Sequence, residues 1–385
     1  MDILQETKDK CLNCQQCKMA CRRLTAFVKR SPGDVAQAVL SGQVDTKVID
    51  FLTKCSLCSL CNELCPYGVD IRGMVTHARN VLVKTGLIDQ ECYRHLWVDH
   101  DWNLFTLFRA NYPPGSTLGQ LVKDNCEVLF FPGCMLSLEG PELVRSAVEW
   151  LNGRLGQQGG AGVSLHCCGE PLEQMGQKAR AKAYSAGLWE HILRSDTSTV
   201  ITSCPTCHAR MLATRPDCQV QIISLYQLMA ESGLRAPAPG AGKVTVHDSC
   251  SDREGRIGGA VRLLLRDCKL VEMAHHGKET ICCGSGGLVS AVDPDLCGER
   301  AIRRIQEVED AGAETCVTSC MSCAHRLAAK KGERNVRHIL ELVFGQSVEH
   351  GEFDRLAHGL FQGERGEETF LRLQHSNLAS FSPGE

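Results

Sequence analysis

The pattern of apolar and polar positions divides the chain into a helical N-terminal part and a longer part in which strands and helices alternate. Residues 32–42 (PGDVAQAVLSG) and 69–87 (VDIRGMVTHARNVLVKTGL) have apolar side chains at the three- and four-residue spacing of amphipathic helices. The first of these begins at Pro32-Gly33, and a proline at the start of a periodic run is a helix-start signal. We therefore predict a helical N-terminal domain.

Further along the chain, short β-rich runs each end at a cysteine. They are 127–134 (EVLFFPGC), 199–204 (TVITSC), 243–250 (KVTVHDSC) and 315–320 (TCVTSC). Residues 141–155 and 299–312, which lie between such runs, have helical spacing. Strands that alternate with helices are typical of parallel α/β units, which bind ligands at the carboxyl ends of their strands. The cysteines therefore stand where such a sheet places a site.

Two stretches rich in proline and glycine, 111–119 (NYPPGSTLG) and 236–242 (APAPGAG), set the expected domain boundaries. In chain order we expect a helical domain at 1–92, a linker at 93–125, α/β domains at 126–235 and 243–345, and a polar tail at 346–385. The tail either docks a partner or is mobile. The predicted fold class is α+β and α/β, with a helical domain followed by two duplicated, Rossmann-like α/β domains.

Five cysteines recur in register across the two α/β segments. The first set is Cys134, Cys167, Cys168, Cys204 and Cys207, and the second set is Cys250, Cys282, Cys283, Cys320 and Cys323. Each member of the second set follows its counterpart by 115 or 116 residues. A register kept over this distance indicates an internal duplication.

Composition narrows the class of protein. The 385 residues include 24 cysteines, and the formal net charge is −3. This charge argues against a nucleic-acid partner, and no apolar run reaches the roughly 18 to 20 residues of a membrane helix. No secretory signal is recognised, so we expect a cytoplasmic protein whose membrane association, if any, goes through a partner subunit. Cysteines in a reducing compartment are more often metal ligands or redox groups than disulfide partners.

Eight cysteines near the N-terminus have the spacing of iron–sulfur ligands. Cys11, Cys14, Cys17 and Cys21 form one C-x2-C-x2-C-x3-C run, and Cys55, Cys58, Cys61 and Cys65 form another. In two-cluster ferredoxins the fourth cysteine of each run ligates the other cluster. This assigns Cys11, Cys14, Cys17 and Cys65 to one cubane 4Fe–4S cluster, and Cys55, Cys58, Cys61 and Cys21 to the other. Pro66 follows the second run as in ferredoxins, whereas Arg22 follows Cys21, so the first run departs from the ferredoxin pattern at this position.

Other chemistries compete for both groups of cysteines. Zinc is the alternative for the N-terminal runs, but structural zinc prefers two pairs of C-x2-C ligands to a run of four. A redox dithiol is the alternative for each five-cysteine set, but it leaves the first cysteine and the adjacent pair unexplained. Adjacent cysteines can hold two irons of a larger or more open cluster, and the glycine that follows each pair lets the backbone turn sharply.

At this point the pattern resembles a known family. A cysteine, a cysteine pair with glycine and a C-x-x-C motif look like the CCG domain, two of which form the B subunit of heterodisulfide reductase. The first 90 residues, best matched in 54–75 (KCSLCSLCNELCPYGVDIRGMV), look like its helical C subunit with two cubane clusters. Both in one chain resemble the fused D-type subunit. Iron–sulfur subunits of glycolate and lactate oxidases and of anaerobic glycerol-3-phosphate dehydrogenase share the layout, and the resemblance covers about residues 8 to 345.

The resemblance implies a function and a ligand set. Each complete CCG motif is similar to one that binds a noncubane 4Fe–4S cluster, and the two clusters split a disulfide between them. One cluster would use the first five-cysteine set and the other the second. Many oxidase-type relatives have lost some of these ligands in one copy, whereas all ten are present in this chain. We therefore expect catalysis of disulfide reduction or formation, with a small-molecule disulfide or dithiol as substrate.

Three further expectations complete the picture. No flavin motif follows a strand, so we expect no flavin on this chain and electron exchange with a flavoprotein, cytochrome or other electron-transfer subunit. A pure electron relay for a flavoprotein dehydrogenase and a structural or sensing role are the alternatives. His247, just before Cys250, is a candidate proton donor to a leaving thiolate or hydrogen-bond donor to a cluster sulfur, or else it caps a strand end.

Overall fold

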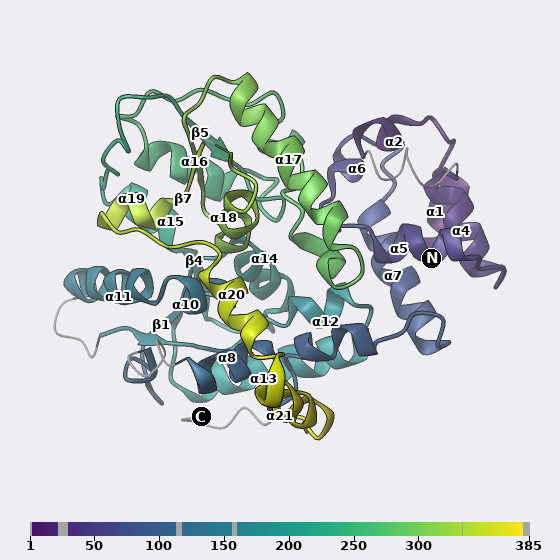
Figure 1. Cartoon of the computed structure of the whole chain (residues 1–385), viewed down its shortest axis with the longest axis horizontal. Helices are drawn as coiled ribbons and strands as arrows, with labels where there is room; N and C mark the ends of the chain where they lie inside the picture. Colours follow the sequence, from purple (N-terminus) through teal and green to yellow (C-terminus); the bar gives the residue numbers. More distant parts are fainter. Residues whose placement is uncertain (1, 22–29, 113–117, 156–159, 333, 380–385) are drawn as a thin grey trace.

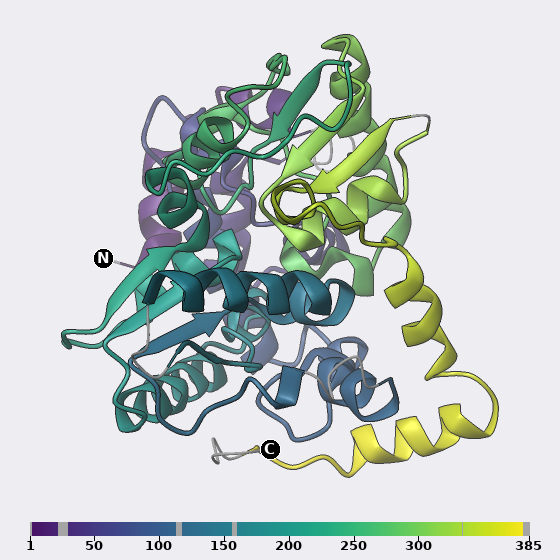
Figure 2. The same cartoon turned by 90° about the vertical axis from the view of Figure 1, so that its left-hand side faces the viewer.

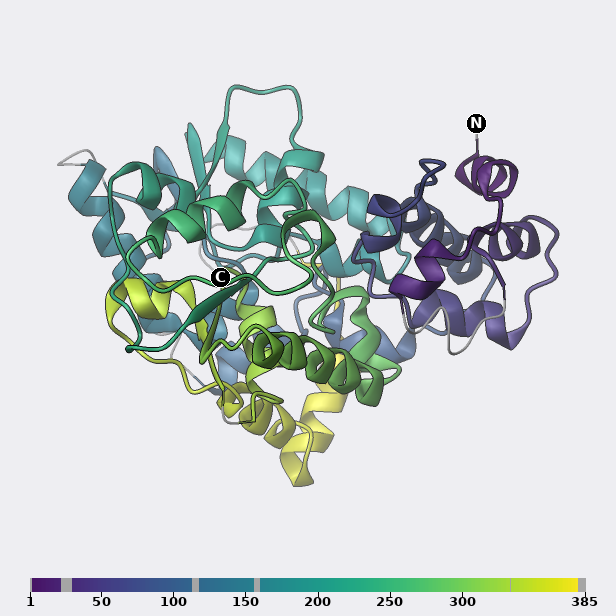
Figure 3. The same cartoon turned by 90° about the horizontal axis from the view of Figure 1, so that it is seen from above.

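The computed structural model describes residues 2–21, 30–112, 118–155, 160–332 and 334–379. Figure 1 shows helices of the N-terminal part beside two α/β halves, with the last two helices crossing the front. Seen from above, the N-terminal helices lie at one end of the molecule (Figure 3).

The N-terminal part is helical, as predicted. Its helices are α1 (Ile3–Lys10), α2 (Gln16–Ala20), α4 (Pro32–Leu40), α5 (Thr46–Thr53), α6 (Leu60–Glu63) and α7 (Ile71–Lys84). Ser31 and Asp34 form a capping box at the start of α4, and the Asp70 carboxylate accepts from the backbone N–H of Gly73 at the start of α7. The apolar faces that predicted these helices pack into one core, in which Val35 and Met74 are fully buried.

The first α/β half contains a four-stranded parallel sheet. Its strands are β1 (Val128–Phe131), β2 (Gly162–Val163), β3 (Thr199–Thr202) and β4 (Gln221–Ser224), in the order β2-β1-β3-β4. Its helices are α10 (Cys134–Glu139), α11 (Pro141–Leu155), α12 (Glu170–Gln174), α13 (Lys178–Arg194), α14 (Pro205–Thr214) and α15 (Leu225–Glu231). The register runs Val128 opposite Thr199 and Thr199 opposite Gln221, so the cysteine turns after β1 and β3 lie at the same sheet edge.

The second half repeats this arrangement with three parallel strands. They are β5 (Val244–His247), β6 (Thr315–Thr318) and β7 (Asn335–His338), in the order β5-β6-β7. Its helices are α16 (Arg256–Leu264), α17 (Pro294–Asp310), α18 (Met321–Ala328) and α19 (Ile339–Phe344), with short turns η2 (Gly277–Glu279) and η3 (Gly286–Ala291). A single parallel bridge between Val244 and Leu270 takes the place of β2. The parallel α/β expectation is confirmed, and the finer Rossmann-like assignment stays a prediction.

The segments expected to be a linker and a tail are more structured than their composition indicates. Residues 93–125 include most of η1 (Glu91–Leu96) and the whole of α8 (Leu104–Asn111), while residues 113–117 of the proline-rich stretch fall outside the described residues. Tail residues form α20 (Glu352–Gly359) and α21 (Gly363–Gln374), which run along the outer edge of the molecule (Figure 2). The ring centroids of Phe353 in α20 and Phe108 in α8 are 4.9 Å apart. The tail helices therefore cover the first half of their own chain.

Arginines from two helices and one loop join the helical domain to the α/β halves. Arg79 on α7 is buried and donates to the backbone carbonyls of Leu52, Cys55, Gln174 and Gly287, which lie in all three parts of the chain. Arg253 donates to the carbonyl of Cys58 at 2.7 Å, and Arg300 on α17 donates to that of Lys54 at 2.9 Å. The loop 54–58 is therefore held mainly by its backbone.

Candidate metal centres

The two N-terminal cysteine loops share an unusual backbone. Asn13 and Gln15 in the first loop have φ values of 55° and 70°, and Leu57 and Ser59 in the second have 52° and 61°. These positions correspond, because each pair flanks the second cysteine of its run. A non-glycine residue in this region costs on the order of 1–3 kcal/mol and persists where the surroundings compensate for it. The repeated strain indicates a loop shaped to wrap a bound group.

The thiols of the two runs are grouped across the runs. Burial, followed by the proximity of Cys11, Cys14 and Cys65, raises the pKa of Cys17 to about 11. Burial, followed by the proximity of Cys55 and then Cys21, raises the pKa of Cys61. Cys65 lines one cavity together with the first three cysteines of the first run, and Cys21 lines another together with the first three of the second run. This geometry supports the crossed ligand assignment, which remains a proposal.

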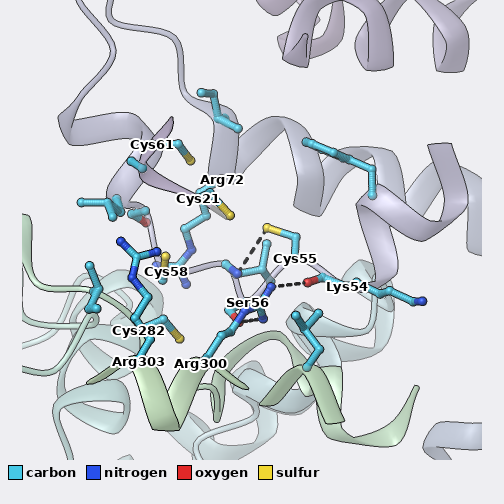
Figure 4. Close-up of a pocket in the computed structure, with 18 of the residues that line it drawn as sticks. Cys21, Lys54, Cys55, Ser56, Cys58, Cys61, Arg72, Cys282, Arg300 and Arg303 are labelled. Atoms are coloured by element: carbon cyan, nitrogen blue, oxygen red, sulfur yellow. Dashed lines mark hydrogen bonds between the residues drawn. The ribbon is translucent and has the colours of Figure 1, made fainter. Parts of the chain in front are cut away.

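A cavity of about 330 Å³ adjoins the second group. Figure 4 shows Cys21, Cys55, Cys58 and Cys61 around it, with Cys282 and two arginines of α17 approaching from the second half. The N–H of Leu57 donates to the Cys55 sulfur at 3.4 Å. Four converging thiols, a cavity, an N–H to sulfur bond and nearby cationic groups fit a bound iron–sulfur cluster, whose net charge is negative.

Within each α/β half the five predicted cysteines come together. In the first half hydrogen-bond contacts link Cys134 to Cys167, Cys167 to Cys168, Cys168 to Cys207, and Cys207 to Cys204. In the second half they link Cys250 to Cys282, Cys282 to Cys283, Cys283 to Cys323, and Cys323 to Cys320. Hydrogen bonds between the thiols lower the pKa of Cys168, Cys204 and Cys282 and raise the pKa of their partners Cys167, Cys207 and Cys250. The convergence of five thiols in each half, and not the pKa of any one of them, is what fits a metal centre.

Local structure explains the positions of these cysteines. Cys204 caps α14 and Cys320 caps α18, so each stands at a helix N-terminus, where negative charge is stabilised. The glycines after the two pairs, Gly169 and Gly284, have φ values of 81° and 99°. A Cβ added at Gly284 would lie 2.5 Å from the carbonyl oxygen of Cys297. The glycine after each pair is therefore required by both its backbone and its surroundings.

The cysteine groups also contact one another. The thiol of Cys58 contacts that of Cys282, which joins the second N-terminal group to the second half. The thiol of Cys204 contacts that of Cys320, which joins the two halves. The order of contact is thus N-terminal runs, second half, first half, and it differs from the order along the chain.

His247 lies beside the cysteines of the second half. It is 1% exposed, and one of its ring nitrogens lies within 4.8 Å of the sulfurs of Cys283 and Cys323. Burial, followed by the nearby Arg304, lowers the pKa of His247 to about 3. Its two predicted roles, as a proton donor to a leaving thiolate and as a hydrogen-bond donor to a cluster sulfur, both stay predictions.

Several residues of the site have no signal in the sequence. Arg79 and Arg304 are fully buried, although arginine spacing marks nothing unusual at either position. Tyr226, also fully buried, donates to the carbonyls of Ser203 and Ser319, which directly precede Cys204 and Cys320. Of the six cysteines outside the two patterns, Cys92 is exposed, Cys218 and Cys268 are half-buried, and the other three are buried.

The family comparisons match both parts of the site. A 4Fe-4S dicluster domain family matches residues 10–70, and the cysteine-rich CCG family matches residues 128–212 and 244–328. The chain is a dicluster iron–sulfur protein with two CCG domains. The predicted class is thereby confirmed, including its duplication, and such clusters are electron carriers.

Relatives of the same class cover most of the chain. An uncharacterized iron-sulfur protein of Methanocaldococcus jannaschii is 23% identical over 82% of this chain and 67% of its own length. The D-type subunit of dihydromethanophenazine:CoB–CoM heterodisulfide reductase from Methanosarcina barkeri is 24% identical over 75% of this chain and 76% of its own. The glycolate oxidase iron-sulfur subunit of Escherichia coli is 22% identical over 86% of this chain and 92% of its own.

Two further findings limit what these similarities show about the function of this chain. The chain spans only 56% and 64% of the length of two other archaeal relatives. A Helicobacter pylori protein of known crystal structure aligns with 94% of this chain and 75% of its own at a TM-score of 0.51 and 10% identity, which is a likeness of fold alone. Among the described residues, no helix has both the length and the apolar character needed to cross a membrane.

Proposed function

We propose that this chain is the iron–sulfur subunit of a multi-subunit oxidoreductase in which a disulfide is reduced or formed at the two CCG halves. When bound, two cubane and two noncubane 4Fe–4S clusters supply one-electron carriers and iron that takes up sulfur. The crossed N-terminal groups would hold the cubane pair. The two five-cysteine sets would hold the noncubane pair.

The order of thiol contacts carries this proposal. Cys58 contacts Cys282, and Cys320 contacts Cys204, so the second N-terminal group adjoins the second half and the second half adjoins the first. Reduction of a disulfide takes two electrons and two protons and yields two thiols. Two adjoining metal centres of equal ligand number can each accept one sulfur, which is why the contact between the halves favours this chemistry.

The N-terminal group is the proposed point of electron entry. Cys14 is exposed, whereas the cysteines of both CCG sets are buried or half-buried. A flavoprotein or cytochrome subunit that docks beside the loop 11–17 therefore reaches the first cubane ligands directly. The CCG cysteines are reached only through the protein or by a small molecule.

Metal analysis with EPR on anaerobic protein, with and without added thiols, tests the proposal. Four clusters of four irons give about 16 iron atoms per chain. We expect this content and a change in the CCG signals when a thiol binds. Iron near 8 per chain would remove the noncubane pair and with it the disulfide chemistry.

An electron relay for a flavoprotein dehydrogenase is the second candidate. It is favoured by the near full-length match to the glycolate oxidase iron-sulfur subunit, which covers 92% of that relative. A full iron content whose spectrum responds to no thiol, but is reduced by a flavoprotein with its 2-hydroxy acid, would support the relay in place of disulfide chemistry.

A further inference from the structure

His247 and Arg304 form a buried pair in the second half. His247 is the last residue of β5, and Arg304 lies on α17; they are 1% and 0% exposed. The Arg304 Nε donates to His247 Nδ1 at 2.9 Å. A guanidinium has donors only, so Nδ1 must be the acceptor. A neutral imidazole with Nδ1 as acceptor carries its proton on Nε2.

The position of Arg304 is fixed by other groups. One of its terminal nitrogens, Nη1, donates to the carbonyl of His275 at 2.7 Å and to the carboxylate of Glu307. The carboxylate of Glu307 balances the charge of the buried guanidinium. These two contacts keep Arg304 in the position from which it donates to His247. The fixed Nε–H of Arg304 therefore sets the tautomer of His247, with the imidazole proton on Nε2.

The Nε2 of His247 points at no protein acceptor. Among the described residues this buried atom has no hydrogen-bond partner. A buried N–H left unpaired destabilises the fold. The sulfurs of Cys283 and Cys323 lie within 4.8 Å of a ring nitrogen of His247. The acceptor that suits this N–H is therefore a sulfur of the bound cluster or of one of its thiolate ligands.

The first half has no such pair. Phe131, the last residue of β1, and Leu188 on α13 stand 116 residues before His247 and Arg304. Both are buried among apolar side chains. The two halves therefore differ at both positions at once, although their ten cysteines correspond.

We propose that Arg304 and His247 act together as a positioning device that donates one Nε2–H hydrogen bond to the cluster of the second CCG half, and that this makes its reduction potential more positive than that of the first half. A donor to sulfur stabilises the reduced state, which carries more negative charge. The second half, which also contacts Cys58, then receives the first electron from the N-terminal clusters. The inference rests on the proposed cluster binding by the second cysteine set.

Redox titration followed by EPR on the anaerobic holoprotein tests the inference. Replacing the imidazole in His247→Phe removes the donor and introduces the residue of the first half. Because that change leaves Arg304 without its acceptor, His247→Phe/Arg304→Leu, which reproduces both residues of the first half, is the second variant. His247→Gln is the matched control, since its amide carries an N–H donor and has no acidic proton to deliver.

We expect the Phe variants to retain all iron and to shift the reduction equilibrium of one CCG signal about tenfold toward the oxidised form, or about 59 mV for a one-electron couple. The Gln variant should keep most of the wild-type potential. Equal potentials in wild type and both Phe variants, or equal shifts in the Phe and Gln variants, would overturn the inference. Loss of one cluster in both His247→Phe and His247→Gln would also overturn it, because the imidazole would then be an iron ligand. A wild-type protein without CCG iron would instead refute the proposed function.

Discussion

Cys282 and Cys283 are neighbours in sequence, but their thiols face different partners. Cys282 contacts Cys250 and Cys58, whereas the Cys283 sulfur lies 3.2 Å from that of Cys323. The pair therefore connects the side of the site that faces the N-terminal domain to the side that faces the first half. Gly284, which follows the pair, has a φ of 99°, which lets the chain turn sharply directly after the two ligands.

Serine at Cys283 should remove one cluster and spare the others. The serine hydroxyl is a poor iron ligand, so we expect iron to fall from about 16 to about 12 atoms per chain while both cubane EPR signals persist. Cys268→Ser is the control, because Cys268 belongs to neither pattern and should leave the iron content unchanged. Survival of all four clusters in Cys283→Ser would show that the pair is not a ligand pair.

The strained residues of the N-terminal loops give a second prediction. Gln15 is exposed and has φ of 70°, so Gln15→Gly should be tolerated or slightly stabilising, while a β-branched Gln15→Val should cost on the order of 1–3 kcal/mol. We expect the Val variant to lose the first cubane faster on titration with an iron chelator. Equal rates of loss in the two variants would mean that the loop relaxes without cost.

At the scale of single residues, the sequence predicted the candidate cysteine ligands and few other residues of the site. Cysteine spacing is a strong signal because few structures need four thiols in one short loop. The roles of Arg304, Arg79 and Tyr226 were not predictable, because a single sequence does not distinguish a buried arginine or tyrosine from an exposed one. His247 was noticed only through its distance from Cys250, and the donor that fixes its tautomer is 57 residues away.

At the scale of elements, the strongly periodic helices and the strands before the cysteines were predicted, and the weakly patterned elements were not. The edge strands β4 and β7 are short and partly exposed, so their sequences lack a buried run. The helix α8 lies in the expected linker, where Phe108 and Leu107 are buried in a cluster that also contains residues of the first half and of the tail. Such contacts arise between segments about 250 residues apart and leave no local pattern.

Arg79 on α7 donates hydrogen bonds to backbone carbonyls of the N-terminal domain and of both α/β halves. Replacing it with leucine leaves several buried carbonyls without donors, which costs about 1–3 kcal/mol for each. We expect Arg79→Leu to lower the thermal midpoint of the holoprotein and to slow electron transfer from the N-terminal clusters to the CCG halves. Stopped-flow reduction followed at cluster absorbance measures the second effect.

A matched variant distinguishes the loss of the contacts between domains from the loss of one positive charge. Arg94, whose side chain pairs with Glu91 at the surface, gives the control Arg94→Leu, which removes the same charge without breaking the join. Both variants should load all clusters. If Arg79→Leu transferred electrons as fast as Arg94→Leu, the arginine would be a stabilising residue only.

At the scale of the whole molecule, His350 joins the two halves through their acidic side chains. Its Nδ1 lies 3.3 Å from Glu139 of the first half, and its Nε2 lies 3.4 Å from Glu341 of the second. Although burial opposes the charged form, the two carboxylates raise the pKa of His350. The charged imidazole therefore contributes to the stability of the join.

This contribution has a definite pH dependence. A raised pKa in the folded state means that the contribution is complete below the unfolded value of about 6.5 and is lost as pH rises through the folded value. We expect the difference in thermal midpoint between wild type and His350→Gln to be largest near pH 6 and to shrink toward alkaline pH. A difference that stayed constant or grew with pH would contradict the ion-pair role.

The way in which the loop 54–58 is held has a consequence for evolution. Arg79, Arg253 and Arg300 grip the carbonyl oxygens of Cys55, Cys58 and Lys54, and every amino acid presents the same carbonyl. Substitutions at the non-cysteine positions of the loop therefore leave these three backbone contacts in place. Selection is free to alter the surroundings of one cluster while the path to the next stays intact, and lineages that use different electron donors can inherit the same joint.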